Sequence, residues 1–263
     1  MNPVHEPAGA QPAASAARSK VAMVVGASRG LGKAIGAAFA HAGAKVVTVS
    51  RGTAPADEPA GGAMRAEIAD AGAEATATTL LERHDPDIVV LVAGAVPPIG
   101  TLQEQTWETF SVNWDADVRI AFHWLRAVLR KPLRPGARVI VVSSGAAIGG
   151  SPLSGGYAGA KATQRFIAQY AQDEARRAGL DIVISTVLPR FAPDTGIGAA
   201  AVRAYAQRAG VGVPEFLETF ERSFGPVVTP EGAGDAIVAL AAERASDVAP
   251  AYLLTGAGLQ KLG

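Results

Sequence analysis

The chain has 263 residues, 49% of them hydrophobic, and its 24 Lys and Arg balance its 24 Asp and Glu. This suits one large α/β domain or two small ones and argues against a basic nucleic-acid-binding surface. Without cysteine, disulfides and thiol nucleophiles are excluded, and the four histidines show no metal-ligand spacing. No apolar run approaches the ~20 residues of a membrane span, and the first twenty residues lack the apolar core of a secretory signal.

The chain begins with a stretch rich in Ala, Pro and Gly. Residues 1–19 show no hydrophobic periodicity and are predicted to be a disordered leader, ahead of a domain at 20–263. A short apolar strand at 21–25 then runs into Gly26-Ala27-Ser28-Arg29-Gly30-Leu31-Gly32, and a helix is expected at 33–41. This order is the context of a dinucleotide-binding loop, because glycines let the backbone approach a pyrophosphate and a helix N-terminus attracts it.

The second strand, at 45–50, bears on the choice of dinucleotide. NAD binders place an acidic residue about 20 positions after the glycine loop, to hold the ribose 2′-hydroxyl. Here the strand ends in Ser50-Arg51, and Arg29 lies within the loop. Two cations without a carboxylate suit a 2′-phosphate, so NADP(H) is expected in preference to NAD(H). The alternative is that either arginine is only a solvated surface charge.

The middle of the chain continues the alternation of strands and helices. A short strand is expected at 64–68, a helix at 71–83 and a buried strand at 88–93. Apolar residues at helical spacing predict a long helix at 106–131. Asn113 lies in its middle, where it is either incidental or bonds backbone and breaks the helix locally. The alternation implies a parallel sheet in one domain, covered by helices on both faces.

The stretch 138–161 carries the most specific polar group. An apolar run at 139–142 predicts a buried strand, followed by Ser144, a glycine-rich loop, Tyr157 and Lys161. Residues four apart share a helix face, so the ammonium of Lys161 would favour loss of the Tyr157 proton. Such pairs are common on ordinary exposed helices. The serine thirteen residues before the tyrosine favours a proton-transfer site.

The last third contains a candidate lid. A strand at 181–188 is ended by Pro189-Arg190, and residues 190–228 are interpreted as a substrate lid region. The aromatic residues in this region are equally compatible with core packing. A helix is expected to start at Thr229-Pro230 and a last strand to lie at 251–255.

With the glycine loop and the Ser-Tyr-Lys group both present, residues 20 to about 258 resemble the short-chain dehydrogenase/reductase family. The resemblance implies an α/β fold, a single-domain Rossmann-like doubly wound parallel sheet of about seven strands. It also implies a nicotinamide cofactor, carbonyl/alcohol chemistry and a cytoplasmic homodimer or homotetramer built on the Asn113 and Tyr157 helices. The residues that carry it are Gly26, Gly30, Gly32, Asn113, Ser144, Tyr157 and Lys161.

The same resemblance assigns roles to these residues. Tyr157 is implied to be the general acid in reduction and the base in oxidation, and Lys161 to favour its proton loss and bind the nicotinamide ribose. Ser144 would hold the carbonyl oxygen, and Asn113 would anchor a water for proton relay. The expected cofactor-binding residues are Gly26, Ser28, Arg29, Gly30, Leu31, Gly32, Ser50, Arg51, Glu67, Ile68, Ala93, Gly94, Tyr157, Lys161, Pro189, Arg190 and Thr195.

Three positions depart from the family pattern. Val92-Ala93-Gly94 replaces Asn-Ala-Gly after the fourth strand, and Glu67 with Ile68 stands in for an acidic residue near the adenine. Arg190 replaces a glycine near the nicotinamide, and the hypothesis is that it contacts cofactor phosphates or an anionic substrate group.

The leading interpretation is therefore an NADP(H)-dependent oxidoreductase acting on a carbonyl or secondary alcohol, without a metal. Two alternatives remain: an epimerase or dehydratase on the same scaffold, and a non-catalytic NADP(H)-binding sensor or interaction protein. An apolar substrate is expected, because the residues predicted to face it are small or apolar. They are Val96, Pro97, Pro98, Ile99, Ala146, Ala147, Ile148, Leu153 and the lid aromatics.

Overall fold

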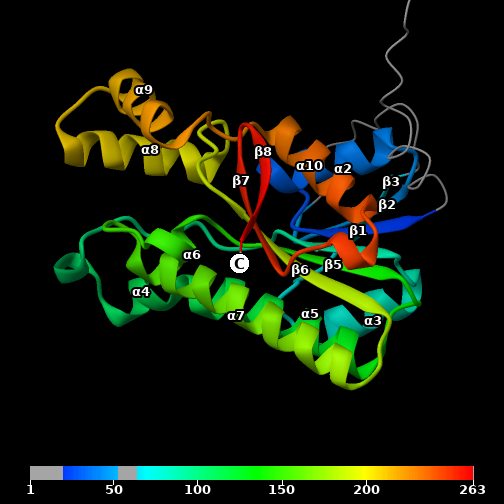
Figure 1. Cartoon of the computed structure of the whole chain (residues 1–263). Helices are drawn as coiled ribbons and strands as arrows, with labels where there is room; N and C mark the ends of the chain where they lie inside the picture. The colour runs from blue at the N-terminus through cyan, green and yellow to red at the C-terminus, as the bar shows by residue number, and fades with distance from the viewer. Residues whose placement is uncertain (1–19, 53–63, 263) are drawn as a thin grey trace, which may run out of the picture.

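The computed structural model of the chain describes residues 20–52 and 64–262, so the predicted leader at 1–19 lies outside the described residues. Eight strands form one sheet in the order β3-β2-β1-β4-β5-β6-β7-β8 (Figure 1). Neighbouring strands pair in parallel from β3 through to β7, and β8 is antiparallel to β7. The strands are β1 Val21–Val25, β2 Lys45–Ser50, β3 Met64–Ile68, β4 Ile88–Leu91, β5 Ala137–Val142, β6 Ile182–Pro189, β7 Ala251–Thr255 and β8 Gly258–Leu262.

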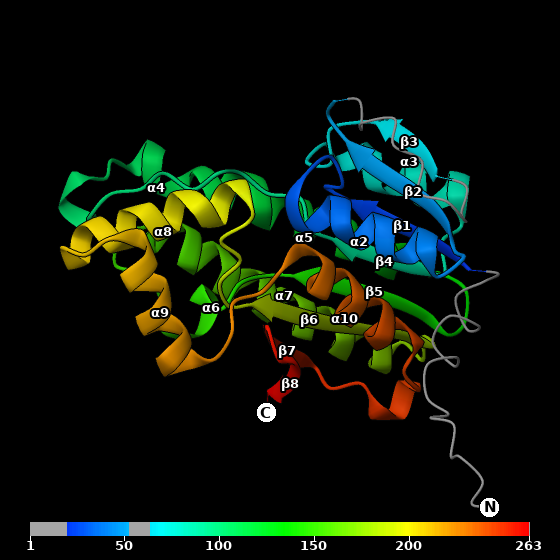
Figure 2. The ribbon, with the colours of Figure 1, turned by 90° about the horizontal axis from the view of Figure 1, so that it is seen from above.

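Helices cover both faces of this sheet, which confirms the predicted doubly wound α/β fold. The helices α2 and α10 lie on one face, and α3, α5 and α7 lie on the other (Figure 1). Seen from above, α8 and α9 stand beyond the end of the sheet (Figure 2). The α-helices are α2 Gly30–His41, α3 Glu74–His84, α4 Trp107–Asn113, α5 Arg119–Arg130, α6 Ala146–Gly149, α7 Gly155–Arg177, α8 Gly196–Ala209, α9 Val213–Phe224 and α10 Pro230–Ala242. Short 3₁₀ turns lie at Leu102–Glu104 and Ala245–Asp247.

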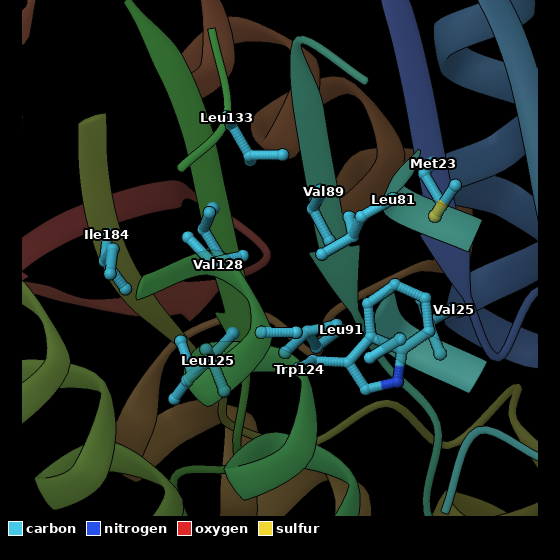
Figure 3. Packing of buried hydrophobic residues seen from close by; sticks show 14 of the residues in the cluster. Met23, Val25, Leu81, Val89, Leu91, Trp124, Leu125, Val128, Leu133 and Ile184 are labelled. Atoms are coloured by element: carbon cyan, nitrogen blue, oxygen red, sulfur yellow. The ribbon is translucent and has the colours of Figure 1, made fainter. Parts of the chain in front are cut away.

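The core lies in two layers, because successive strand residues point to opposite faces of the sheet. On the side of α3, α5 and α7, Met23 and Val25 of β1 pack with Trp124 of α5, whose side chain is fully buried (Figure 3). The indole Nε1 of Trp124 donates to the Ala71 carbonyl at 3.1 Å, so its only polar atom is satisfied. On the other side, α2 and α10 cover the alternate strand residues, Ala22 and Val24 among them.

Three sequence predictions need correction. The long helix expected at 106–131 is interrupted, since a π-helical segment, η2 Trp114–Val118, separates α4 from α5. Helix α2 begins at Gly30 rather than at residue 33. The antiparallel strand β8 was not expected. A two-residue turn with glycine on both sides of Ala257 joins it to β7, and that is a hairpin signal.

The topology also determines where a ligand can bind. The strand order runs outward in both directions from β1 and β4, so the chain connections reverse direction between these two strands. In doubly wound sheets the crevice outside the carboxyl ends of the strands at this point is the usual ligand site. The glycine loop after β1 and the loop after β4 both lie there.

Candidate active site

A cavity of about 910 Å³ opens at the carboxyl ends of the strands. The glycine loop, the loop after β4, the end of β5 and the start of α7 all line it. Helices α8 and α9 contribute the rest of its wall. Of the predicted residues, the cavity is lined by Gly26, Ser28, Arg29, Gly30, Leu31, Gly32, Ser50, Arg51, Ala93, Gly94, Ser144, Tyr157, Lys161, Pro189, Arg190 and Thr195.

The glycine loop is packed so closely that two of its glycines have no room for a side chain. Gly26 has φ +100°, and a Cβ on it would lie 2.5 Å from the backbone nitrogen of Ala93. A Cβ on Gly32 would lie 2.1 Å from the carbonyl oxygen of Gly26. The residues thus form a backbone cradle after β1, at the start of a helix, which suits a pyrophosphate group.

The first turn of α2 is open to an anion. Its N-cap residue, Arg29, makes no side-chain capping bond, and no acidic residue lies in the first turn. The unpaired N–H groups and the positive end of the helix dipole therefore face the cavity. The side chains of Arg29 and Arg51 are exposed and both line the cavity. A phosphorylated dinucleotide such as NADP(H) fits this set of donors.

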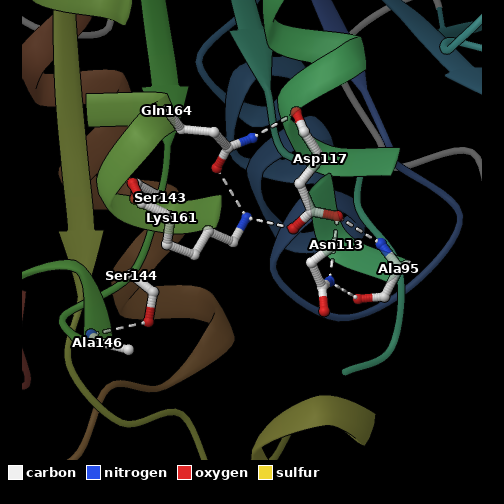
Figure 4. A network of polar contacts seen from close by, with 8 residues as sticks. All are labelled: Ala95, Asn113, Asp117, Ser143, Ser144, Ala146, Lys161 and Gln164. Atoms are coloured by element: carbon white, nitrogen blue, oxygen red, sulfur yellow. Dashed lines mark hydrogen bonds and ion pairs between the residues drawn. The ribbon is translucent and has the colours of Figure 1, made fainter. Parts of the chain in front are cut away.

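A buried polar network joins two of the predicted catalytic residues, Asn113 and Lys161 (Figure 4). Asn113 is 1% exposed and does not line the cavity. Its Nδ2 donates to the Ala95 carbonyl at 3.0 Å and to Asp117 Oδ1 at 3.3 Å. Asn113 thus bonds backbone of the loop after β4, at the residue where α4 gives way to the π segment.

Lys161 is held at the centre of the same network. Its Nζ lies 3.0 Å from Asp117 Oδ2 and donates to Gln164 Oε1 at 3.0 Å (Figure 4). Burial alone would lower the pKa of the Lys161 ammonium. The charge of Asp117, the Tyr157 oxygen and the hydrogen bond to Asp117 together outweigh that effect and hold the pKa of Lys161 above its usual value.

Tyr157 and Ser144 border the cavity beside Lys161. The Nζ of Lys161 lies 5.5 Å from the centre of the Tyr157 ring, so the two side chains share a face of α7 as their spacing predicts. The Ser144 hydroxyl accepts a hydrogen bond from the Ala146 amide at 3.2 Å. This bond fixes the serine oxygen at the end of β5, with its own proton left for a ligand.

Glu67 and Ile68 do not line the cavity, contrary to expectation. Glu67 instead bonds Arg83 and His84 of α3, each at 2.8 Å, so its side chain is drawn away from the strand ends. Burial would raise the pKa of the Glu67 carboxyl, but the hydrogen bond with His84 and the charge of Arg83 hold it below its usual value. Asp70, three residues on, lines the cavity instead.

Arg190 lines the cavity but is engaged by α9. Its guanidinium lies 4.9 Å from the centre of the Phe224 ring, and its NH1 donates to the Phe224 carbonyl at 3.2 Å. Whether this side chain turns to a cofactor phosphate or an anionic substrate stays a prediction. The backbone of Arg190 lies close to Gly145, where a Cβ would be 3.2 Å from the Arg190 Cα. A glycine at position 145 leaves room for this approach.

The aromatic residues of 190–228 pack on one another rather than in the core. The rings of Phe191 and Phe220 are 4.8 Å apart, and those of Tyr205 and Phe216 are 6.3 Å apart and stacked. Helix α9 has no buried residue, and all four rings line the cavity. The substrate-facing interpretation is therefore the better one, while closure as a lid stays a prediction.

Several residues predicted to face the substrate lie elsewhere. Pro97, Ile99, Ala146 and Ile148 line the cavity. Val96, Pro98, Ala147 and Leu153 do not. Leu153 is buried, and Ala147 packs beside the small core cluster of Leu188, Ala251 and Leu253.

Known proteins resemble this chain in sequence and in fold. A family model for short chain dehydrogenase matches residues 20–206. The chain belongs to the short-chain dehydrogenase family. This membership and the reductase names of its relatives place the chain among the NAD(P)-dependent oxidoreductases.

Two curated relatives of this short-chain dehydrogenase are reductases. Versicolorin reductase 1 of Aspergillus parasiticus is 37% identical over 155 residues, 54% of this chain and 58% of that protein. The 3-oxoacyl-[acyl-carrier-protein] reductase MabA of Mycobacterium avium is 27% identical over 246 residues, 92% of this chain and 90% of that protein. The match therefore spans little more than half of the first relative and nearly all of the second.

Solved structures share the fold of this short-chain dehydrogenase. A 3-oxoacyl (acyl-carrier-protein) reductase of Agrobacterium tumefaciens C58 with NADP bound has a TM-score of 0.72 at 26% identity, covering 94% of this chain and 97% of that one. A short chain dehydrogenase family protein of Francisella tularensis also has a TM-score of 0.72, at 18% identity, covering 89% and 95%.

Sequence reasoning missed two polar residues of this short-chain dehydrogenase, Asp117 and Gln164. Both are buried, at 1% and 2% exposure, and both bond Lys161. The available signal was their spacing, since Asp117 lies four residues after Asn113 and Gln164 three after Lys161, on the same helix faces. Tyr205 was named only as a lid aromatic, yet its hydroxyl hydrogen-bonds Ser151, which lies four residues before the start of α7.

Proposed function

We propose that the chain is an NADP(H)-dependent oxidoreductase that interconverts a carbonyl and a secondary alcohol, with Tyr157 as general acid and base. The observation that carries the proposal is the cavity that Tyr157, Lys161 and Ser144 line together with the glycine loop. A positioned proton donor of this kind typically contributes about 10²–10⁴ in rate.

Each side chain has a physical task in this proposal. When bound, NADPH supplies the hydride that the chain's own residues do not. Ser144, its oxygen fixed by the Ala146 amide, donates to the carbonyl oxygen of the substrate. Tyr157 gives that same oxygen its proton. Lys161 stabilises the resulting phenolate and binds the ribose.

The substrate is proposed to be apolar. Support comes from the aromatic residues Phe191, Tyr205, Phe216 and Phe220 and from the apolar Pro97 and Ile99, which all line the cavity. In a homologous series of alkyl ketones, kcat/KM should rise about fourfold for each added CH₂ that is buried, which corresponds to about 0.8 kcal/mol. NADPH absorbance measures the series, with aldoses as the polar comparison. A preference for sugars, or no turnover in either group, would contradict the proposal.

The same assay separates the alternatives. Net NADPH consumption in proportion to alcohol formed excludes an epimerase or dehydratase that recycles its cofactor in place. NADPH binding by calorimetry without turnover of any carbonyl, in wild type and Tyr157→Phe alike, would favour the non-catalytic sensor.

NADP(H) is proposed as the preferred cofactor because Arg29 and Arg51 border the cavity at the start of α2 and the end of β2. Replacing Arg51 with Ala should weaken NADPH binding about 10- to 100-fold, the typical worth of a hydrogen bond to a charged group. NADH, which lacks the 2′-phosphate, serves as the internal control and should bind the variant and wild type equally. Titration calorimetry measures both. Equal losses for the two cofactors, or a wild-type preference for NADH, would reject this assignment.

A homodimer or homotetramer is proposed, with α5 and α7 at the interface. Support comes from exposed aromatic rings on these helices, with Phe122 at 51%, Phe166 at 68% and Tyr170 at 58% exposure. Sedimentation equilibrium measures the assembly. No helix in the described part of the chain is long and apolar enough to cross a membrane. Action in the cytoplasm stays part of the proposal.

A further inference from the structure

The buried carboxylate of Asp117 is the feature of this site that the proposed chemistry does not require. It belongs to the π-helical segment η2 and is only 1% exposed. Its Oδ1 accepts from the Ala95 amide at 2.8 Å and from Asn113 Nδ2 at 3.3 Å, while Oδ2 faces Lys161 Nζ at 3.0 Å. Burying such a pair costs several kcal/mol per ion, so a packing role alone is a poor reason for it.

The surrounding backbone is shaped to hold this carboxylate. Gly94 lies against it so closely that a Cβ there would be 2.7 Å from Asp117 Oδ1. Gln164 donates from Nε2 to the Asp117 carbonyl at 2.9 Å and accepts from Lys161 through Oε1. Apart from the ion pair with Lys161, Asp117 Oδ2 has no partner among the described residues. The carboxylate is therefore aimed at the ammonium.

Two of the three donors of the Lys161 ammonium are taken up by this arrangement. One N–H is left for the Tyr157 side, where Nζ lies 5.5 Å from the ring centre. Without a paired carboxylate, burial would favour loss of the ammonium proton. The pair thus fixes the direction of the lysine and keeps its charge beside the phenol.

We propose that Asp117 is a positioning residue that holds Lys161 in place and keeps it charged, so that the ammonium can stabilise a phenolate at Tyr157. The inference rests on the proposed function for its consequence, which is that Tyr157 exchanges its proton with the substrate oxygen near neutral pH. It rests on the contacts of Asp117 alone for the charge of Lys161.

Other charged groups face the cavity but are less able to do this. In the described residues they are Arg29, Arg51, Asp70, Asp115, Arg119 and Arg190. Arg190 is half-buried and engaged with Phe224, and the other five are exposed, so solvent screens their charges. The elements packed against Lys161 from the end of β5 contribute Ser143 and Ser144, which are neutral. Asp117 is the buried charge beside the lysine.

The experiment is an alkaline titration of tyrosinate absorbance, with Asp117→Asn as the variant. Subtracting the matching Tyr157→Phe protein from each sample isolates the Tyr157 signal, so no substrate is needed. The amide keeps the shape and removes the negative charge, so Lys161 loses its proton more readily and the Tyr157 midpoint should rise by about one pH unit or more. Asp173→Asn, which removes an exposed carboxylate of α7 that pairs with Arg176, should leave the midpoint unchanged.

An unchanged midpoint in a folded Asp117→Asn protein would overturn the inference. If that variant does not fold, Asp117→Ser replaces it, since a serine hydroxyl can still accept from the Ala95 amide, and the same midpoint decides. The pH profile of kcat/KM for reduction should shift to higher pH by the same amount. Wild-type protein without turnover would count against the proposed function, whereas the titration would still decide the role of Asp117.

Discussion

Replacing Tyr157 with Phe should lower kcat for carbonyl reduction by about 10²–10⁴, because the ring remains while the proton donor is lost. Phe keeps the shape that packs beside Lys161, so the fold and the affinity for NADPH should be retained. Single-turnover measurements at saturating NADPH test the chemical step, and calorimetry tests binding.

Tyr170→Phe is the matched control for this change. Tyr170 lies on the same helix, α7, is 58% exposed and does not line the cavity, so its variant should keep wild-type kcat. A Tyr157→Phe enzyme within threefold of wild type would mean that a proton reaches the substrate by another route. The assignment of Tyr157 would then fail even if NADPH is consumed.

The second large effect is expected from Gly156→Ala, at the residue before Tyr157. A Cβ at Gly156 would lie 2.0 Å from the carbonyl oxygen of Phe110, so α4 and α7 must move apart. Such overpacking typically costs about 1–3 kcal/mol, and each kcal/mol lowers Tm by about 2–4 °C for a chain of this size. Displacing Tyr157 by about 1 Å can cost a further factor of about 10² in rate.

Gly155 provides a neighbouring control in the same helix turn. A Cβ there meets only the edge of the Phe110 ring, at 3.6 Å, which is an ordinary contact. Gly155→Ala should therefore be neutral or stabilising by up to about 1 kcal/mol, because alanine favours the helix. Thermal unfolding of both variants measures the contrast. Equal Tm values for the two would show that α4 and α7 are not packed as closely as the structure has them.

The parts of the fold that follow from local patterns were predictable from the sequence. The strand β2 at Lys45–Ser50 has the expected bounds, because an apolar run between a glycine and a loop leaves little choice. The glycine loop was predictable as well, because its glycines lie between the first strand and the first helix. The structure gives the reason for them, since the close backbone approach at Gly26 and Gly32 admits no other residue. The spacing of Tyr157 and Lys161 correctly predicts their shared face.

The parts that depend on tertiary contacts were not predictable. An acidic residue in a helix is usually exposed, so its spacing from Asn113 alone does not show that Asp117 is buried against Lys161. Glu67 was expected at the cofactor, but Arg83 and His84 of α3, sixteen and seventeen residues away, hydrogen-bond its side chain. Asn113 left two alternatives open, and its bond to the Ala95 carbonyl, formed across the fold, decides between them.

The π-helical segment makes the length of this stretch as important as its composition. Deleting one residue from Trp114–Val118 would turn α5 by about 100° about its axis relative to α4. Trp124 would then leave the core, or Asn113 would leave the loop after β4, since the two lie on opposite sides of the segment. Trp124 of α5 can face the core while Asn113 of α4 faces the loop after β4 only because the π-helical segment lies between the two helices. A deletion there should therefore be less tolerated than any single substitution.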